Sequence, residues 1–130
     1  MPRTADDVEN ILYALNRNFE SRGEGTYLVS SGTDGPPIAV HVDDPIVVVR
    51  VDIGPVPKDD KRQLALFRQM LEYNGSSLVH CAYALEGGEI VLTSGNALDN
   101  IDANEIAAVL SDIDLALARH VKILRELATE

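Results

Sequence analysis

Hydrophobic positions along the chain follow two periods, and the changes between them divide the chain into eight elements. Apolar residues that recur every three or four positions indicate amphipathic helices, whereas strict alternation with polar residues indicates strands. Three helices are predicted, over residues 5–21, 58–73 and 103–128. Five strands are predicted, over residues 26–31, 38–42, 46–53, 78–86 and 89–94, with a turn at residues 32–37. The element order is therefore α-β-β-β-α-β-β-α.

Local signals mark where the helices begin and end. Thr4 followed by Asp7 is typical of a capping box, in which side chains satisfy the free N–H groups of the first turn. Asp102 is the expected N-cap of the last helix. Asn74 and Gly75 favour the end of the second helix, because both residues tolerate the left-handed conformation that is common there.

The same spacing indicates which face each helix buries. The second helix is expected to bury Leu64, Phe67 and Leu71, with Met70 beside them. The last helix carries a longer apolar seam, which consists of Ala103, Ile106, Leu110, Ile113, Leu117, His120, Leu124 and Leu127. At about 26 residues this helix would be roughly 39 Å long, more than the width of five strands at about 4.8 Å each. Part of it is therefore expected to pack on something other than the sheet.

Gly87 and Gly88 predict a β-hairpin, because a two-residue turn of the primed type needs positive φ at both central positions. The pairs expected across this hairpin, on a face assigned to the core, are Leu85 with Ile90, Tyr83 with Leu92 and Cys81 with Ser94. The opposite face carries small or semi-polar side chains, namely His80, Ala82, Ala84, Val91 and Thr93.

The strand over residues 46–53 predicts how the sheet is covered. Arg50 and Asp52 alternate in it with β-branched residues, so one face is polar and the other apolar. Such a strand belongs to an antiparallel sheet that is packed on one side and open on the other. The predicted fold is α+β, a single antiparallel sheet of about five strands with three helices and a long C-terminal helix. A length of 130 residues fits one domain, over residues 1–130.

The charge balance narrows the classes of partner. The chain has 21 acidic and 11 basic residues, a formal net charge of −10. Nucleic acids and anionic membranes attract basic surfaces, so neither is an expected partner. The negative charge serves either solubility or contact with a basic segment of a partner. A single cysteine allows no internal disulfide and the N-terminus shows no signal peptide, so a cytoplasmic location is expected.

Few residues suggest catalysis, and no cofactor or metal is expected. Cys81 lies beside His80, but neighbouring residues of a strand point to opposite faces, so the two cannot form a nucleophilic pair. Cys81 is instead assigned to the core. The three histidines lack the spacing of metal ligands. Asp112 and Asp114 cannot share a helix face and are interpreted as solvated charges.

These features together resemble the class I type III secretion chaperones (the Tir-chaperone family) and YbjN-like proteins. The resemblance rests on the element order, the small acidic chain, the Gly87-Gly88 hairpin and the Asp102 and Glu105 start of the last helix. It covers nearly the whole chain and is strongest over residues 64–70, 83–96 and 106–127. It implies a homodimer that holds an extended segment of a partner. The polar open sheet face favours the YbjN-like group.

The predicted function is that of a non-catalytic protein-binding module, chaperone- or adaptor-like, that acts as a homodimer. Its partner-binding surface is expected on the open sheet face, at His41, Val48, Arg50, Asp52 and His80. Its dimer interface is expected on the last helix and the hairpin, at Ala82, Ala84, Val91, Leu117, His120, Val121 and Leu124. A dimer that buries His120 would be sensitive to pH.

Two alternatives stay open. The first is a small-ligand binder or enzyme that uses a pocket near His41, Arg50, Asp52 and His80. The second is a regulator that sequesters a basic partner through its acidic charge.

Overall fold

The computed structural model describes residues 3–31 and 35–129, and in these ranges the chain forms four helices and six strands. The helices are α1 (Ala5–Ala14), α2 (Asp60–Ser76), α3 (Ala103–Arg119) and α4 (Val121–Ala128). The strands are β1 (Phe19–Gly23), β2 (Thr26–Val29), β3 (Ile38–Asp43), β4 (Ile46–Pro55), β5 (Ala82–Glu86) and β6 (Glu89–Ala97). All six belong to one antiparallel sheet in the order β1-β2-β3-β4-β6-β5.

The α+β class and the single antiparallel sheet are confirmed, with six strands in place of about five and four helices in place of three. The turn expected at residues 32–37 lies partly outside the described residues. None of the helices in the described ranges combines the length and the hydropathy needed to cross a bilayer.

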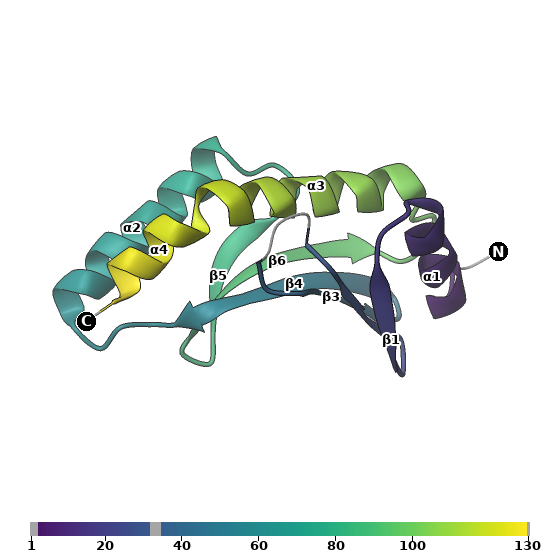
Figure 1. The fold of residues 1–130 in the computed structure, drawn as a ribbon, viewed down its shortest axis with the longest axis horizontal. Helices are drawn as coiled ribbons and strands as arrows, with labels where there is room; N and C mark the ends of the chain where they lie inside the picture. Colours follow the sequence, from purple (N-terminus) through teal and green to yellow (C-terminus); the bar gives the residue numbers. More distant parts are fainter. Residues whose placement is uncertain (1–2, 32–34, 130) are drawn as a thin grey trace.

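The helices cover only one face of the sheet. Figure 1 shows α2, α3 and α4 on the same side of the strands, with α1 beside β1 at one end. Along β4 the buried residues are at most 4 % exposed, and they are Val47, Val49, Val51 and Ile53. Arg50 and Asp52 alternate with them and face the open side. The core therefore lies between the inner face of β4 and its neighbours and the helical layer.

The first helix ends well before the predicted residue 21, because Asn16 stops it. Asn16 has a φ of 58°, and the amide of Arg17 donates to the carbonyl of Leu12 at 3.4 Å. This is the pattern of a Schellman C-cap, in which a left-handed residue turns the chain out of the helix. The chain then enters β1, where Phe19 pairs with β2 instead of extending the helix face.

The face that α2 buries differs in part from the predicted one. Leu66 is fully buried and Met70, one turn later, is buried beside it. Leu64 and Leu71 are 72 % and 70 % exposed. The helix carries two apolar stripes, and the one that contains Leu66 and Met70 faces the core. Of the residues that were assigned to the core, Leu64 and Leu71 therefore lie on the surface, whereas Phe67 and Met70 pack as expected.

Asn74 was expected to end α2, but the helix continues through Gly75 to Ser76. The Asn74 side chain instead binds the backbone of Tyr83. Its Nδ2 donates to the carbonyl of Tyr83 at 3.1 Å, and its Oδ1 accepts from the Tyr83 amide at 2.8 Å. Tyr83 lies in β5, the edge strand, so the Asn74 amide occupies backbone groups that another strand would otherwise pair with.

The β5–β6 hairpin is confirmed in its turn and in its register. Gly87 and Gly88 have φ values of 57° and 80°, and the pairs include Leu85 with Ile90 and Tyr83 with Leu92. The first strand is shorter than predicted, because it begins at Ala82 and not at residue 78. Cys81 therefore precedes β5, although its side chain is buried in the core as expected.

The last predicted helix is interrupted at His120. The His120 ring stacks on Tyr73 of α2, with centroids 3.7 Å apart and planes 9° apart. Its Nδ1 also shares a hydrogen bond of 3.2 Å with the Tyr83 hydroxyl. Figure 1 shows α4 leaving the line of α3 and lying beside α2, which it contacts. What the last helix packs on besides the sheet is therefore α2 of the same chain.

The sequence suggested that Asp112 is a solvated charge. Its carboxylate instead holds the loop between α2 and β5 by hydrogen bonds. Its Oδ2 accepts hydrogen bonds from the amides of Val79 and His80 at 3.1 and 2.9 Å and from the Cys81 thiol at 3.3 Å. Burial alone would raise the pKa of Asp112, but these bonds outweigh it and hold the pKa below its ordinary value. The loop is thus bound to α3 through one carboxylate.

Asp114 is also paired. Its Oδ2 lies 3.0 Å from Nη2 of Arg17, and both side chains are mostly buried. Arg17 follows α1, so this ion pair joins the start of the chain to α3, against which α1 packs. Both carboxylates that were interpreted as solvated therefore connect α3 to distant parts of the chain.

We expect Asp112→Ala to lower the free energy of unfolding by about 2 kcal/mol, since hydrogen bonds to a charged group are worth about 1.5–3 kcal/mol. Because the folded pKa of Asp112 is lowered, its stabilisation is present above the unfolded value of 3.8 and is lost as the pH falls below it. Urea unfolding at pH 7 measures the first effect. The control is Asp99→Asn, at an exposed position. Equal stability of both variants and the wild type would contradict the assignment.

Candidate protein-binding surfaces

The open face of the sheet carries part of the predicted partner-binding surface. The strand register sets His41 of β3 opposite Val48 of β4, both on the open side, with Arg50 and Asp52 further along β4. The Arg50 guanidinium lies 3.0 Å from Asp52 Oδ1 and also pairs with Glu86 of β5. These hydrogen bonds, first to Glu86 and then to Asp52, raise the pKa of Arg50 above its ordinary value.

Arg50 also covers apolar surface. It lies in β4 and its partner Glu86 lies in β5, and β6 runs between those strands. The guanidinium must therefore cross β6. Val91 of β6 is opposite Asp52 in the register, on the open face, yet it is only 1 % exposed. The Arg50 ion pairs thus shield a valine that would otherwise face solvent.

Glu86 was not among the predicted site residues. The spacing of Arg50 and Asp52 along one strand already places them on the same face. The proximity of Glu86 depends on the order β4-β6-β5, in which two strands distant in sequence become neighbours. The hairpin pattern alone does not contain that order.

The two histidines of the predicted pocket do not join this cluster. His41 Nδ1 shares a hydrogen bond of 2.7 Å with the Thr26 hydroxyl on the exposed face. His80 lies in the loop before β5, and its amide donates to Asp112 on the helical side. Within residues 3–31 and 35–129, no group of three or more His, Cys, Asp or Glu side chains could hold a metal ion. The structure therefore brings Arg50 and Asp52 together, but not the four residues of the predicted pocket.

Cys81 is placed as a structural residue. Its thiol donates to Asp112 and is nearly buried. Burial, reinforced by the Asp112 carboxylate, raises the pKa of the Cys81 thiol far above its ordinary value. Because the thiolate is the nucleophilic form, this thiol is held in the unreactive state.

The residues of the predicted dimer interface are largely internal to the chain. Five of them are buried in the chain itself, and these are Val91, Leu117, His120, Val121 and Leu124. Ala82 and Ala84 of β5 are half-buried. The apolar seam on α3 and α4 is thus largely occupied by the sheet and by α2 of the same chain.

A different apolar surface is exposed where α2 meets β5. Leu64 and Leu71 are exposed on α2, and Leu85 at the end of β5 lines one groove with Leu71 and the half-buried Phe67. Between helix and strand is a shallow groove of about 390 Å³, lined by Phe67, Met70, Leu71, Asn74, Tyr83, Ala84 and Leu85. We call these residues, with Leu64, the α2–β5 surface. The hydrophobic periodicity of the sequence identified the leucines of this surface but assigned them to the core.

The comparisons with known proteins agree with this architecture. A family model for CesT_Tir_1, the type III secretion chaperones, matches residues 1–130, the full chain. The chain belongs to the type III secretion chaperone family. The resemblance noted in the sequence is thereby confirmed. No curated protein matches.

Solved structures with a similar fold include proteins of type III secretion systems. One chain of the heterodimeric complex ExoU-SpcU from the type III secretion system of Pseudomonas aeruginosa is 20 % identical, with a TM-score of 0.72, over 92 % of this chain and 98 % of that one. A chain in the Yersinia pestis structure of the secretion chaperone SycH with a stable fragment of YscM2 is 16 % identical, with a TM-score of 0.60, over 88 % and 99 %.

The YbjN side of the resemblance is also found. The crystal structure of YbjN from E. coli, described as a putative transcription regulator, is 14 % identical, with a TM-score of 0.58, over 89 % of this chain and 95 % of that one. At these identities the likeness to each solved structure concerns the fold.

The buried His120 makes the stability of this family member dependent on pH. Burial first, and then the nearby charge of Arg119, lower its pKa, while Asp112 acts in the opposite direction. Tyr73 and Tyr83 pack against the ring and are neutral below pH 8. The unfolded chain binds a proton near pH 6.5, whereas the folded chain resists it. Stability is therefore complete above about pH 6.5 and declines as the pH falls below it.

We expect the free energy of unfolding of the wild type to fall between pH 7.5 and pH 5.5, as measured by urea unfolding at each pH. In His120→Gln this decline should become smaller. His80→Gln removes an exposed histidine and should keep the wild-type decline. If His120→Gln kept the full pH dependence, the buried imidazole would not be its source.

Proposed function

We propose that the protein is a non-catalytic chaperone of the cytoplasm that acts as a homodimer and holds an extended segment of a partner protein. The observation that carries this proposal is the match of the secretion chaperone family to the full chain. Membership of a chaperone family favours a binding role over catalysis. The unreactive state of the Cys81 thiol agrees with it.

The partner that fits best is a protein exported by a secretion system. Two solved structures of the fold are complexes with a second protein: one is the heterodimer ExoU-SpcU from a type III secretion system, and the other holds the secretion chaperone SycH with a fragment of YscM2. A role in transcription, as in the description of YbjN, is less compatible with this chain. Its net charge of −10 repels the phosphate backbone.

The homodimer is proposed to form through the α2–β5 surface. Large apolar side chains that lie together on a surface mark interfaces, and Leu64 and Leu71 are each about 70 % exposed. A two-fold axis that passes near α2 would bury this stripe against its own copy, as a self-complementary contact requires. Ala84, one of the residues expected in the interface from the sequence, lines this surface.

The Asn74 contact favours helix packing over strand pairing in such a dimer. Asn74 already binds both backbone groups of Tyr83 at the free edge of β5. Joining two β5 edges would break these bonds within the strand. The side chains of α2 and β5, and not their backbones, therefore supply the contact.

We expect Leu71→Glu to convert the dimer to a monomer in light scattering at micromolar concentration. The substitution places an unpaired carboxylate from both copies in an apolar contact, and we expect a dissociation constant about a hundredfold higher, at about 1.4 kcal/mol per tenfold. The matched control is Leu115→Glu, because Leu115 is 51 % exposed on α3. It should leave the mass of the dimer unchanged. A wild type that is monomeric at this concentration would contradict the homodimer.

The partner is tested by affinity capture of the tagged protein from its own cell extract, with partners identified by mass spectrometry. We expect one protein retained in stoichiometric amount, with the complex sized by light scattering as one partner on a chaperone dimer. Retention should persist at 0.5 M salt, because an apolar interface is little screened. Loss of all bound protein at that salt would instead favour the sequestration of a basic partner by charge.

A further inference from the structure

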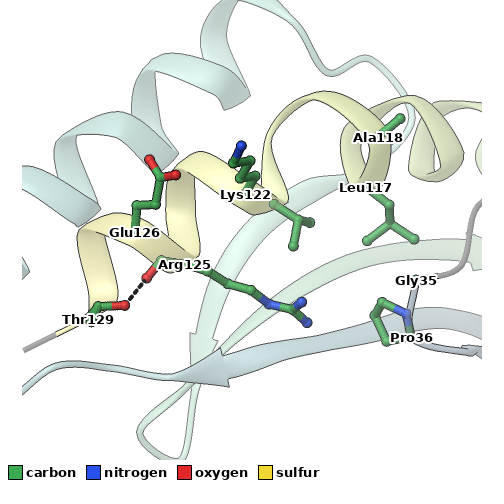
Figure 2. A pocket seen from close by; sticks show the side chains of 9 residues that line it. Gly35, Pro36, Leu117, Ala118, Lys122, Arg125, Glu126 and Thr129 are labelled. Atoms are coloured by element: carbon green, nitrogen blue, oxygen red, sulfur yellow. Dashed lines mark hydrogen bonds between the residues drawn. The ribbon is translucent and has the colours of Figure 1, made fainter.

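A hollow lies between α4 with the end of α3 and the segment that leads into β3. Its volume is about 600 Å³, and its apolar lining includes Leu117, Val121 and Pro36. Figure 2 shows Leu117 and Arg125 directed into the space between the helices and the sheet, with Pro36 across from Leu117. An apolar side chain that entered this hollow would be removed from water on several sides, which favours its binding.

Arg125 connects this hollow to a second one. The second has a volume of about 270 Å³ and lies on the other side of Arg125, with Ile53, Pro55 and Ile90 in its walls. Thr129 lines both hollows as well. A single guanidinium therefore stands where two largely apolar hollows meet. We call the two together the Arg125 groove.

Within the described part of the chain, the Arg125 guanidinium has no carboxylate partner. Its Nη2 donates to the carbonyl of Ile53 at 3.4 Å, which is long for a hydrogen bond. Among residues 3–31 and 35–129, its side chain forms no ion pair within 4.0 Å. Arg17 and Arg50, by contrast, each lie 3.0 Å from an aspartate oxygen. Most of its five N–H donors are thus available to an acceptor.

The neighbouring charges do not satisfy Arg125. Lys122 and Glu126 also border the groove, but in Figure 2 their charged ends point away from the sheet. They lie one turn apart on α4, so their charges largely offset each other. Among the described residues, the charge directed into the groove is that of Arg125, and it is positive in a chain whose net charge is −10.

From this geometry we infer that the Arg125 groove binds a segment of a partner protein in which an Asp or Glu is flanked by apolar residues. The carboxylate would pair with the guanidinium, whose planar fork matches two carboxylate oxygens. The flanking apolar side chains would fill the hollows on its two sides. The inference rests on the proposed function, because it describes the segment that the chaperone holds.

The probe is a set of fluorescein-labelled nine-residue peptides with a central Glu, in which Leu or Phe occupies each pair of flanking positions in turn. A matched set carries Gln in place of the Glu. Fluorescence anisotropy at pH 7.5 measures their binding to the full chain. We expect at least one Glu peptide to bind the wild type, and its Gln counterpart to bind about tenfold more weakly, since a buried charge-assisted contact is lost.

The decisive variant is Arg125→Gln, which should bind the Glu and Gln peptides equally and as weakly as the wild type binds Gln peptides. Arg119→Gln removes the same charge from an exposed position at the end of α3, outside the groove, and should bind as the wild type does. Both variants should melt close to the wild type, because both positions are exposed. Arg125→Lys should recover part of the preference for Glu.

Three outcomes would overturn the inference: no Glu peptide binds, Glu and Gln peptides bind the wild type equally, or Arg119→Gln loses binding as Arg125→Gln does. The capture experiment described above decides the proposed function separately. A partner retained by both the wild type and Arg125→Gln would leave the chaperone standing and remove the groove as its binding site. Peptide binding that depends on Arg125, with no partner captured, would establish the groove without the chaperone.

Discussion

The alternation of apolar residues along β4 is buried on one side only, and the rest of the structure follows from that asymmetry. Val47, Val49, Val51 and Ile53 face the helices, and β4 lies in the middle of the sheet, between β3 and β6. Three helices over one face bury this core at the cost of leaving a second face and two strand edges in solvent. The polar contacts of Arg50 and Asn74 partly compensate for that exposure.

In each of these two contacts, a single polar side chain covers part of the sheet that a further helix would otherwise cover. Arg50 reaches across β6 to Glu86, over the strand in which Val91 is only 1 % exposed. Asn74 occupies the backbone of Tyr83 at the edge of β5. The α2–β5 surface and the Arg125 groove have no such cover. Uncovered apolar surface is costly in a free chain, which is the physical reason to seek the functional contacts at these two places.

The limits of sequence reasoning in this chain lie in contacts between distant residues. Periods of two and of three to four residues predict five of the six strands, the hairpin pairing and the seam of the last helix, because those depend on near neighbours; β1 was missed. The stop at Asn16 has only a weak local signal, since asparagine enters the left-handed conformation far less readily than glycine. The face of α2 was ambiguous between Leu64 and Leu66, and only the position of the sheet decides it. Likewise, the break at His120 has no proline or glycine to announce it, and it coincides with contacts to Tyr73 and Tyr83.

In the proposed Arg125 groove, the force that a partner meets at long range differs in sign from the contact that recognises it at short range. The net charge of −10 repels an acidic partner at a distance, but at physiological salt such repulsion fades within about 8 Å. A carboxylate in contact with Arg125, between two apolar hollows, is exposed to little of that screening. Its pairing can therefore persist where the overall field does not. A basic segment would meet the opposite forces: the net charge of the chain would attract it, and Arg125 would repel it from the groove. Selection by a local contact against the overall charge gives specificity, because few acidic segments also carry the apolar flanks that the hollows require.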